Sequence, residues 1–117
     1  MVIMNIKFAN KTIMHLCNTE RVMLSKYGQN CTNILKKRLL QLFAAEYLGI
    51  FLPPGSKPLK CTSHTDASSN LFRLPLHEKH ILIFESIDGR IQSGSSNLDW
   101  NTIRTIMIHN IEKISHV

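Results

Sequence analysis

The sequence has few of the residues that mark secreted, membrane-spanning or metal-binding proteins. It contains three cysteines, an odd number without metal-ligand spacing, which favours a reducing compartment. No apolar run approaches the length of a transmembrane helix, and the first residues lack the long apolar segment of a signal peptide. These absences predict a cytoplasmic protein with no membrane segment.

The chain also lacks the common signatures of catalytic sites. It has no glycine-rich phosphate loop, no nucleophile elbow and, despite six histidines, no metal-spaced set of His and Cys. We therefore expect no metal site and no cofactor. The 117 residues leave room for a single domain, residues 1–117, with one hydrophobic core.

Acidic residues are scarce relative to basic ones, and the imbalance is uneven. Eight Asp and Glu against 14 Lys and Arg give a formal net charge of +6. Residues 1–60 hold nine basic and two acidic side chains, whereas residues 61–117 hold five and six. Such a concentration of positive charge points to a polyanion or an acidic protein as partner, although plain solvation of a helix surface accounts for it about as well.

The chain is organised around residues 71–85, LFRLPLHEKHILIFE. Phe72, Leu74 and Leu76 alternate with other residues, as in a strand with one buried face. Residues 81–84 are apolar without alternation, as in a strand covered on both faces. The polar turn at 77–80 between these runs predicts an antiparallel hairpin.

The N-terminal half has helical periodicity. Alternation over residues 4–8 predicts a short strand, and Asn10 or Thr12 is expected to cap a short helix through Cys17. After Gly28, apolar residues at helical spacing predict a long helix over residues 29–48.

Two glycine- or proline-containing segments and a polar stretch divide the rest. Gly49 is the type of residue that ends a helix in a left-handed conformation, and residues 53–55 start an extended segment. Residues 61–70 are expected to form a loop, and residues 103–111 a terminal strand. Helices at the start and strands at the end predict an α+β fold, with an antiparallel sheet of about four strands and two or three N-terminal helices packed on it.

Basic and imidazole residues fall on the elements expected to share one face of the sheet: Lys57, Lys60, Arg73, His77, Lys79, His80, His109 and His116. Such groups suit RNA cleavage, in which the 2′-hydroxyl is deprotonated, attacks phosphorus and expels the 5′-oxygen. Lys and Arg clamp phosphate, and His serves as acid or base near neutral pH. A merely adhesive basic groove would have the same composition.

The ordered series of motifs resembles the RelE/ParE superfamily of bacterial toxins, and within it the HigB-type branch. The stretches that carry the likeness are Phe8–Lys11, Lys37–Leu39, Ala44–Leu48, Lys57–Lys60, Ile83–Glu85, Asp99–Trp100 and Ile111–His116. The resemblance implies a RelE-like α+β fold. It also implies the toxin component of a type II toxin–antitoxin system, an endoribonuclease that cleaves mRNA on the ribosome and inhibits translation. The partners implied are a cognate HigA-like antitoxin and mRNA, and both a homodimer and a toxin–antitoxin hetero-oligomer stay open.

The resemblance also implies catalytic roles for three residues. Lys60 matches the lysine that stabilises the scissile phosphate, His116 matches the C-terminal acid or base, and Lys57 stands where this branch often has a histidine. The RNA-binding residues expected are those of the long helix and those on or beside the hairpin: Lys36, Lys37, Arg73, His77, Lys79 and His80.

The sequence departs from the family at positions that bear on activity. Ile81 replaces an arginine, Ile114-Ser115 replace an Asp-Tyr pair, and Cys61 replaces a glycine. Arg73, His77, Lys79 or His80, on or beside the hairpin, are expected to supply the positive charge that the missing arginine would carry. The alternatives are a ParE-like toxin that binds DNA gyrase without catalysis and a catalytically decayed basic binding module.

Overall fold

The structure, a computed structural model, describes residues 3–51, 62–63, 71–77, 79–91 and 98–113. The helices are α1 (Lys11–Asn18) and α2 (Glu20–Ala44), with the 3₁₀ turns η1 (Leu48–Phe51) and η2 (Trp100–Thr102). The strands are β1 (Asn5–Phe8), β2 (Thr62–Ser63), β3 (Leu71–Pro75), β4 (His80–Ser86), β5 (Arg90–Ile91), β6 (Leu98–Asp99) and β7 (Thr105–Lys113). The α+β class expected from the sequence is confirmed.

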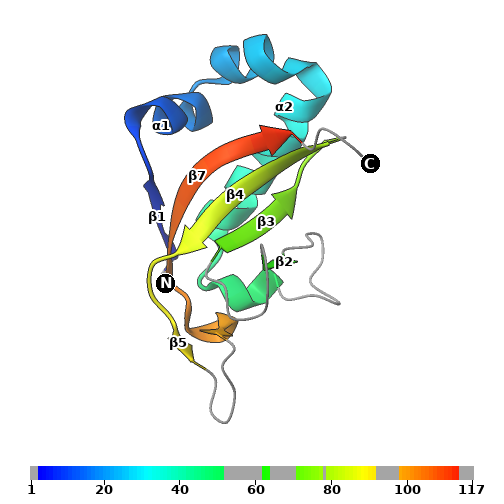
Figure 1. The fold of residues 1–117 in the computed structure, drawn as a ribbon. Coiled ribbons are helices and arrows are strands. Elements are labelled where there is room, and N and C mark those ends of the chain that lie inside the picture. The colour runs from blue at the N-terminus through cyan, green and yellow to red at the C-terminus, as the bar shows by residue number, and fades with distance from the viewer. Residues whose placement is uncertain (1–2, 52–61, 64–70, 78, 92–97, 114–117) are drawn as a thin grey trace.

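Five strands form the main sheet, in the order β1-β7-β4-β3-β2, and β5 and β6 form a separate ribbon (Figure 1). Three of the four neighbouring pairs are antiparallel, as expected. The pair β1–β7 departs from that expectation because it is parallel, with Asn5 opposite Thr105 and Phe8 opposite Ile108. Strand β1 lies at the edge of the sheet beside β7, the last strand. The two strands run in the same direction.

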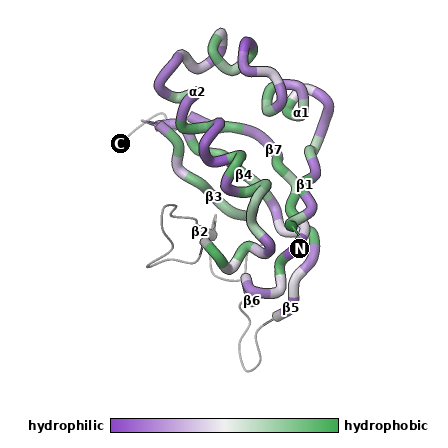
Figure 2. Tube along the Cα trace, turned by 180° about the vertical axis from the view of Figure 1, so that it is seen from behind, coloured by the Kyte–Doolittle hydropathy of each residue, from purple (hydrophilic) through white to green (hydrophobic). Residues whose placement is uncertain are grey.

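Helix α2 crosses one face of the sheet, behind it in Figure 1 and in front of it when the molecule is seen from behind in Figure 2. The core between them is apolar and almost fully buried. It is formed mainly by Leu35, Leu39 and Leu42 of α2, Phe72 and Leu74 of β3, Leu82 and Phe84 of β4, and Ile106 and Ile108 of β7. Burying each of these side chains contributes about 2 kcal/mol to the free energy of unfolding, so this layer is the main source of stability. The apolar stripe predicted for the helix is confirmed as a core-facing surface.

The N-terminal helices begin and bend where the sequence indicates. The Asn10 side chain accepts a hydrogen bond from the amide of Ile13 at 2.9 Å, which caps α1. Gly28 has φ of 81°, so α2 is interrupted there and its two halves take different directions. The separation predicted at Gly28 is confirmed.

The predicted end of the long helix was wrong. Helix α2 stops at Ala44 rather than at residue 48, and Gly49 lies in the 3₁₀ turn η1. Backbone groups after Ala44 bond to other segments: the Ala45 carbonyl accepts from the amide of Met4 at 2.7 Å, and the Leu48 amide donates to the Ile103 carbonyl at 3.0 Å. These bonds, to the residue just before β1 and to the segment before β7, replace further turns of helix.

The hairpin β3–β4 is confirmed, with Leu71 opposite Glu85 and Pro75 opposite Ile81. Strand β4 is buried on both faces, as its apolar run predicts. Within the predicted loop 61–70, residues 62–63 instead form β2, which pairs with β3. The predicted terminal strand is confirmed as β7, which extends to Lys113.

Candidate functional site

The three residues expected to be catalytic, Lys57, Lys60 and His116, lie outside the described residues. Their convergence on one face of the sheet therefore stays a prediction. The departures at Cys61 and at 114–115 also lie outside the described residues. The remaining candidates can be placed, and they do not share one surface.

Neither α1 nor α2 covers the face of the sheet opposite the core, which we call the open face (Figure 1). Successive side chains of a strand point to opposite faces, so the residues between the core positions of β3, β4 and β7 lie on it. They include Arg73, Ile81, Ile83, Glu85, Met107, His109, Asn110 and Glu112, of which Ile81 and Ile83 are buried. Arg73 lies opposite Ile83 in register and is half-buried.

A β-bulge sets the position of His109. Phe84 pairs with Ile108 and Ile83 pairs with Asn110, so His109 is an extra residue on β7 at this point. Such a bulge bends the strand and redirects the side chain of the inserted residue. Here it lets two consecutive residues, His109 and Asn110, lie on the open face, because Asn110 is opposite Ile83 in register.

The His109 imidazole and the Glu85 carboxylate form an ion pair on the open face when the imidazole is protonated. The distance from His109 Nε2 to Glu85 Oε1 is 2.7 Å, and the two side chains are 35% and 31% exposed. When Nε2 donates to the carboxylate, the ring orientation is fixed and Nδ1 becomes the nitrogen that can exchange a proton with a ligand. The arrangement is an oriented imidazole on a partly exposed surface, which can bind phosphate or transfer a proton.

Sequence reasoning included His109 among the candidates but missed its pairing with Glu85. The two residues are 24 positions apart, and only the register of β4 and β7, with its bulge, brings them together. A carboxylate in one expected strand and an imidazole in another are the only signal for the pair in the sequence.

His80 does not join Arg73 and His109. It lies on the core side of β4, where its ring meets the edge of Tyr27 at a centroid distance of 5.2 Å and an angle of 77°. Burial, with a smaller contribution from Cys31, raises the pKa of Tyr27, so this phenol stays protonated at neutral pH. The expectation that His80 shares a face with Arg73 was therefore wrong, because even-numbered positions of β4 face α2.

His77 and Lys79 lie in the turn of the hairpin. The His77 carbonyl accepts from the amide of His80 at 3.1 Å, which helps to close the turn, and Lys79 is exposed. These two side chains lie at one end of the sheet, beyond Arg73 along the hairpin.

The cations of α2 lie on the helix that packs against the core side of the sheet. Lys36 is bonded to Glu20 at 2.8 Å, and Lys37 is exposed on the side of the helix away from the sheet. Partial burial lowers the pKa of Arg38, whose Nη1 donates to Gln41 Oε1 at 3.2 Å. Lys36 and Lys37 are therefore separated from the open face by the sheet itself.

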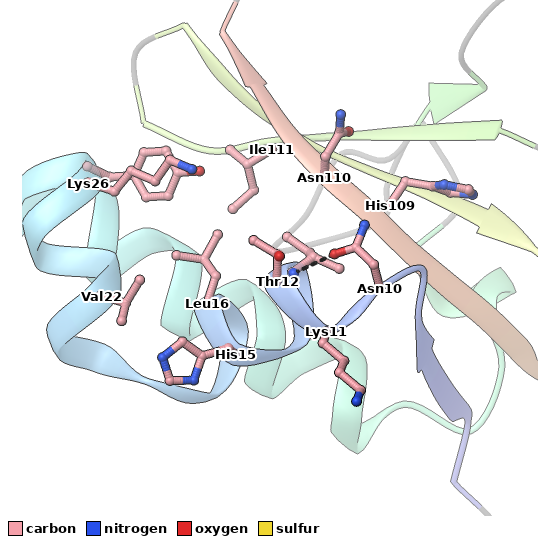
Figure 3. Close-up of a pocket in the computed structure, with 12 residues that line it drawn as sticks. Asn10, Lys11, Thr12, His15, Leu16, Val22, Lys26, His109, Asn110 and Ile111 are labelled. Atoms are coloured by element: carbon pink, nitrogen blue, oxygen red, sulfur yellow. Dashed lines mark hydrogen bonds between the residues drawn. The ribbon is translucent and has the colours of Figure 1, made fainter.

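A cleft of about 520 Å³ opens between α1, the first half of α2 and the C-terminal half of β7 (Figure 3). Its lining includes Leu16, Lys26, Tyr27 and Ile111. Sequence reasoning missed it, although the expected first strand is much shorter than the last one. A short strand beside a long one leaves part of the longer edge unpaired.

Among the described residues, no three His, Cys, Asp or Glu side chains lie close enough together to hold a metal ion. Cys17 is buried, and burial raises the pKa of its thiol to about 11, which makes it a poor nucleophile and a poor ligand at neutral pH. No helix in the described ranges has the length and apolar character needed to cross a membrane.

Comparison with protein-family models, with curated proteins and with solved structures gives no match to this chain. The resemblance to the RelE/ParE superfamily therefore stays a prediction from the sequence.

Proposed function

We propose that this chain is the toxin component of a type II toxin–antitoxin system and cleaves mRNA on the ribosome without a metal ion. The observation that carries the proposal is the placement of α1 and α2. Neither helix packs on the face of β3, β4 and β7 where the half-buried Arg73 and the partly exposed His109–Glu85 pair lie, although Ile81 and Ile83 on the same face are buried. The RelE-like resemblance implies a small α+β domain with an antiparallel sheet flanked by N-terminal helices, and the α+β class of this chain agrees with that.

The proposed chemistry is a transfer of the phosphorus from one oxygen to another. A base removes the proton of the 2′-hydroxyl, the 2′-oxygen attacks phosphorus, and the bond to the 5′-oxygen breaks as an acid protonates that oxygen. The products are a 2′,3′-cyclic phosphate and a free 5′-hydroxyl. By the resemblance, Lys60 stabilises the charge that develops on the phosphoryl oxygens, and His116 transfers a proton. Lys57 acts as the second proton-transfer group or as a further cation.

Arg73 and His109 extend the proposed site along the open face. A guanidinium binds phosphate oxygens through paired hydrogen bonds, and an imidazole held by a carboxylate presents its other nitrogen in a fixed direction. In this proposal they bind the phosphates flanking the scissile linkage. Lys36, Lys37 and His80 are not assigned to RNA binding, because their placement lies away from the open face.

The test is to induce the protein in growing bacteria and to map the ends of transcripts. The wild-type chain should give translation-dependent cuts in mRNA, and the His116→Ala variant should give none. His15→Ala is the matched control, because His15 is an exposed histidine on α1, away from the open face. It should cut like the wild type.

Other outcomes contradict the proposal. Intact transcripts with DNA damage would favour a gyrase-binding toxin of the ParE type. Intact transcripts with normal growth would indicate a decayed binding module. Cuts that persist at the same sites in His116→Ala would remove His116 from the mechanism.

A further inference from the structure

The edge of β7 is only partly paired. Strand β1 pairs with residues 105–108, and the Ala9 amide then donates to the Ile108 carbonyl at 2.9 Å. The chain next turns away at Asn10 to begin α1, while β7 continues to Lys113. Within the described part of the chain, no strand pairs with residues 109–113 on the side that β1 leaves.

The unpaired edge faces the cleft rather than another strand. Backbone amides and carbonyls of a strand point alternately to its two sides, so about half of those in residues 109–113 point into this space. In Figure 3, Ile111 of β7 and Leu16 of α1 point toward one another across the cleft, and Asn110 points away from it. The cleft thus combines an apolar floor with a row of backbone hydrogen-bonding groups.

The charged residues that line the cleft are all cationic. They are Lys11 near one end and Lys26 near the other (Figure 3), and the lining has no carboxylate. A neighbouring hollow shares Lys26 and adds Arg21. The nearest acidic residue of the strand, Glu112, is opposite Ile81 in register and so lies on the open face. Glu20, at the start of α2, is paired with Lys36.

We propose that this cleft binds an extended acidic peptide of another protein, which adds to the sheet as a strand along residues 109–113 of β7. Main-chain hydrogen bonds would give affinity, aliphatic side chains of the peptide would pack on the floor, and its carboxylates would meet Lys11 and Lys26. The proposal does not rest on the proposed ribonuclease activity, although His109, assigned there to phosphate binding, also lines this cleft. A volume of about 520 Å³ accommodates a few residues of such a peptide.

A peptide fits these observations better than a nucleic acid does. Phosphates would use the lysines but would leave unpaired the carbonyls of the strand edge, which carry partial negative charge. The floor of Ile13, Leu16 and Ile111 matches aliphatic side chains, and the cleft lining offers one tyrosine but no series of aromatic rings for stacked bases.

The binding experiment uses the full chain and an octapeptide of alternating glutamate and valine, acetylated, amidated and dye-labelled, with anisotropy as the readout. Lys26→Glu should weaken binding by about five- to tenfold, because an attraction becomes a repulsion. Lys37→Glu, on the same helix but outside the cleft, is the matched control and should change affinity by less than about twofold. Thermal unfolding checks that both variants fold.

Two further measurements test strand addition itself. Amide hydrogen exchange should slow at residues 109–113 when the peptide is added, and a peptide N-methylated at alternate residues should bind at least about tenfold more weakly. Three results would each overturn the proposal. The peptide does not bind, Lys26→Glu and Lys37→Glu lose the same amount of affinity for it, or the methylated peptide binds with full affinity. The proposal would also be overturned if an octauridylate displaces the peptide and binds more tightly at the same residues. The cleft would then be a nucleic-acid site.

Discussion

Gly49 offers the sharpest test of how the two 3₁₀ turns pack. A Cβ atom added to Gly49 would overlap the side-chain oxygen of Asn101 and would lie 2.9 Å from its Cγ and 3.0 Å from its Cα. Carbon atoms in ordinary contact are about 3.5–4.0 Å apart, so η1 and η2 would have to separate by several tenths of an ångström. Leu48, fully buried and bonded through its amide to the Ile103 carbonyl at 3.0 Å, resists that shift.

Overpacking of this kind costs about 2 kcal/mol. A chain of 117 residues has an unfolding entropy of about 250 cal/mol/K, so Gly49→Ala should lower Tm by about 8 °C. Helix propensity alone predicts the opposite sign, since alanine is favoured over glycine in a helical turn by about 1 kcal/mol.

The decisive measurement is a double-mutant cycle followed by thermal or urea unfolding. In an Asn101→Ala background two of the three close atoms are gone, and the cost of Gly49→Ala should fall to about half. An equal cost in both backgrounds would refute the close-approach explanation and would support a purely conformational role for Gly49. A stabilising Gly49→Ala would refute both.

Two further predictions concern single side chains. Because burial raises the pKa of Cys17 to about 11 from a usual 9.0, its thiolate fraction at pH 8 should be about a hundredfold lower, which alkylation kinetics will show. The contribution of this shift to the free energy of unfolding should be fully present below pH 9 and should fall by about 2 kcal/mol as the pH rises to 11, and Cys17→Ala should remove that share of the loss in urea titrations. Asp88 Oδ1 accepts hydrogen bonds from the amides of Arg104 at 2.9 Å and Thr105 at 3.0 Å. Asp88→Ala should therefore lower the free energy of unfolding by about 2 kcal/mol, and Asp88→Asn should lower it less. Amide hydrogen exchange at Thr105 should become faster in Asp88→Ala, and an unchanged exchange rate would contradict this role.

The parts of the fold that depend on local sequence were predictable. Alternation at 72–76 gave β3 the correct inward face, and the cap at Asn10 and the break at Gly28 follow from the conformational preferences of single residues. The end of α2 was not predictable in this way. Residues 45–48 would continue a helix by propensity, but bonds to Met4 and Ile103 hold them in another conformation.

The parts that depend on distant pairing were harder to predict. The parallel contact of β1 with β7 and the His109–Glu85 pair both follow from sheet register, which no short window of sequence contains. His80 was assigned to the wrong face for a similar reason. The face on which its side chain lies depends on the register of β4 with β3 and β7. The chemistry of single residues indicated which side chains could bind or transfer a proton. The register of the sheet determines which of these side chains are in contact.

The pairing of β1 with β7 has a consequence for the order of folding. Residues 5–8 find their sheet partner roughly a hundred residues later in the chain, so a nascent polypeptide holds its first strand without a neighbour until β7 has been synthesised. Local contacts in α1 and α2 can form early, but closure of the sheet is a late, long-range event. Pulse-labelling of stalled chains should therefore find protected amides in α2 well before any appear in β1.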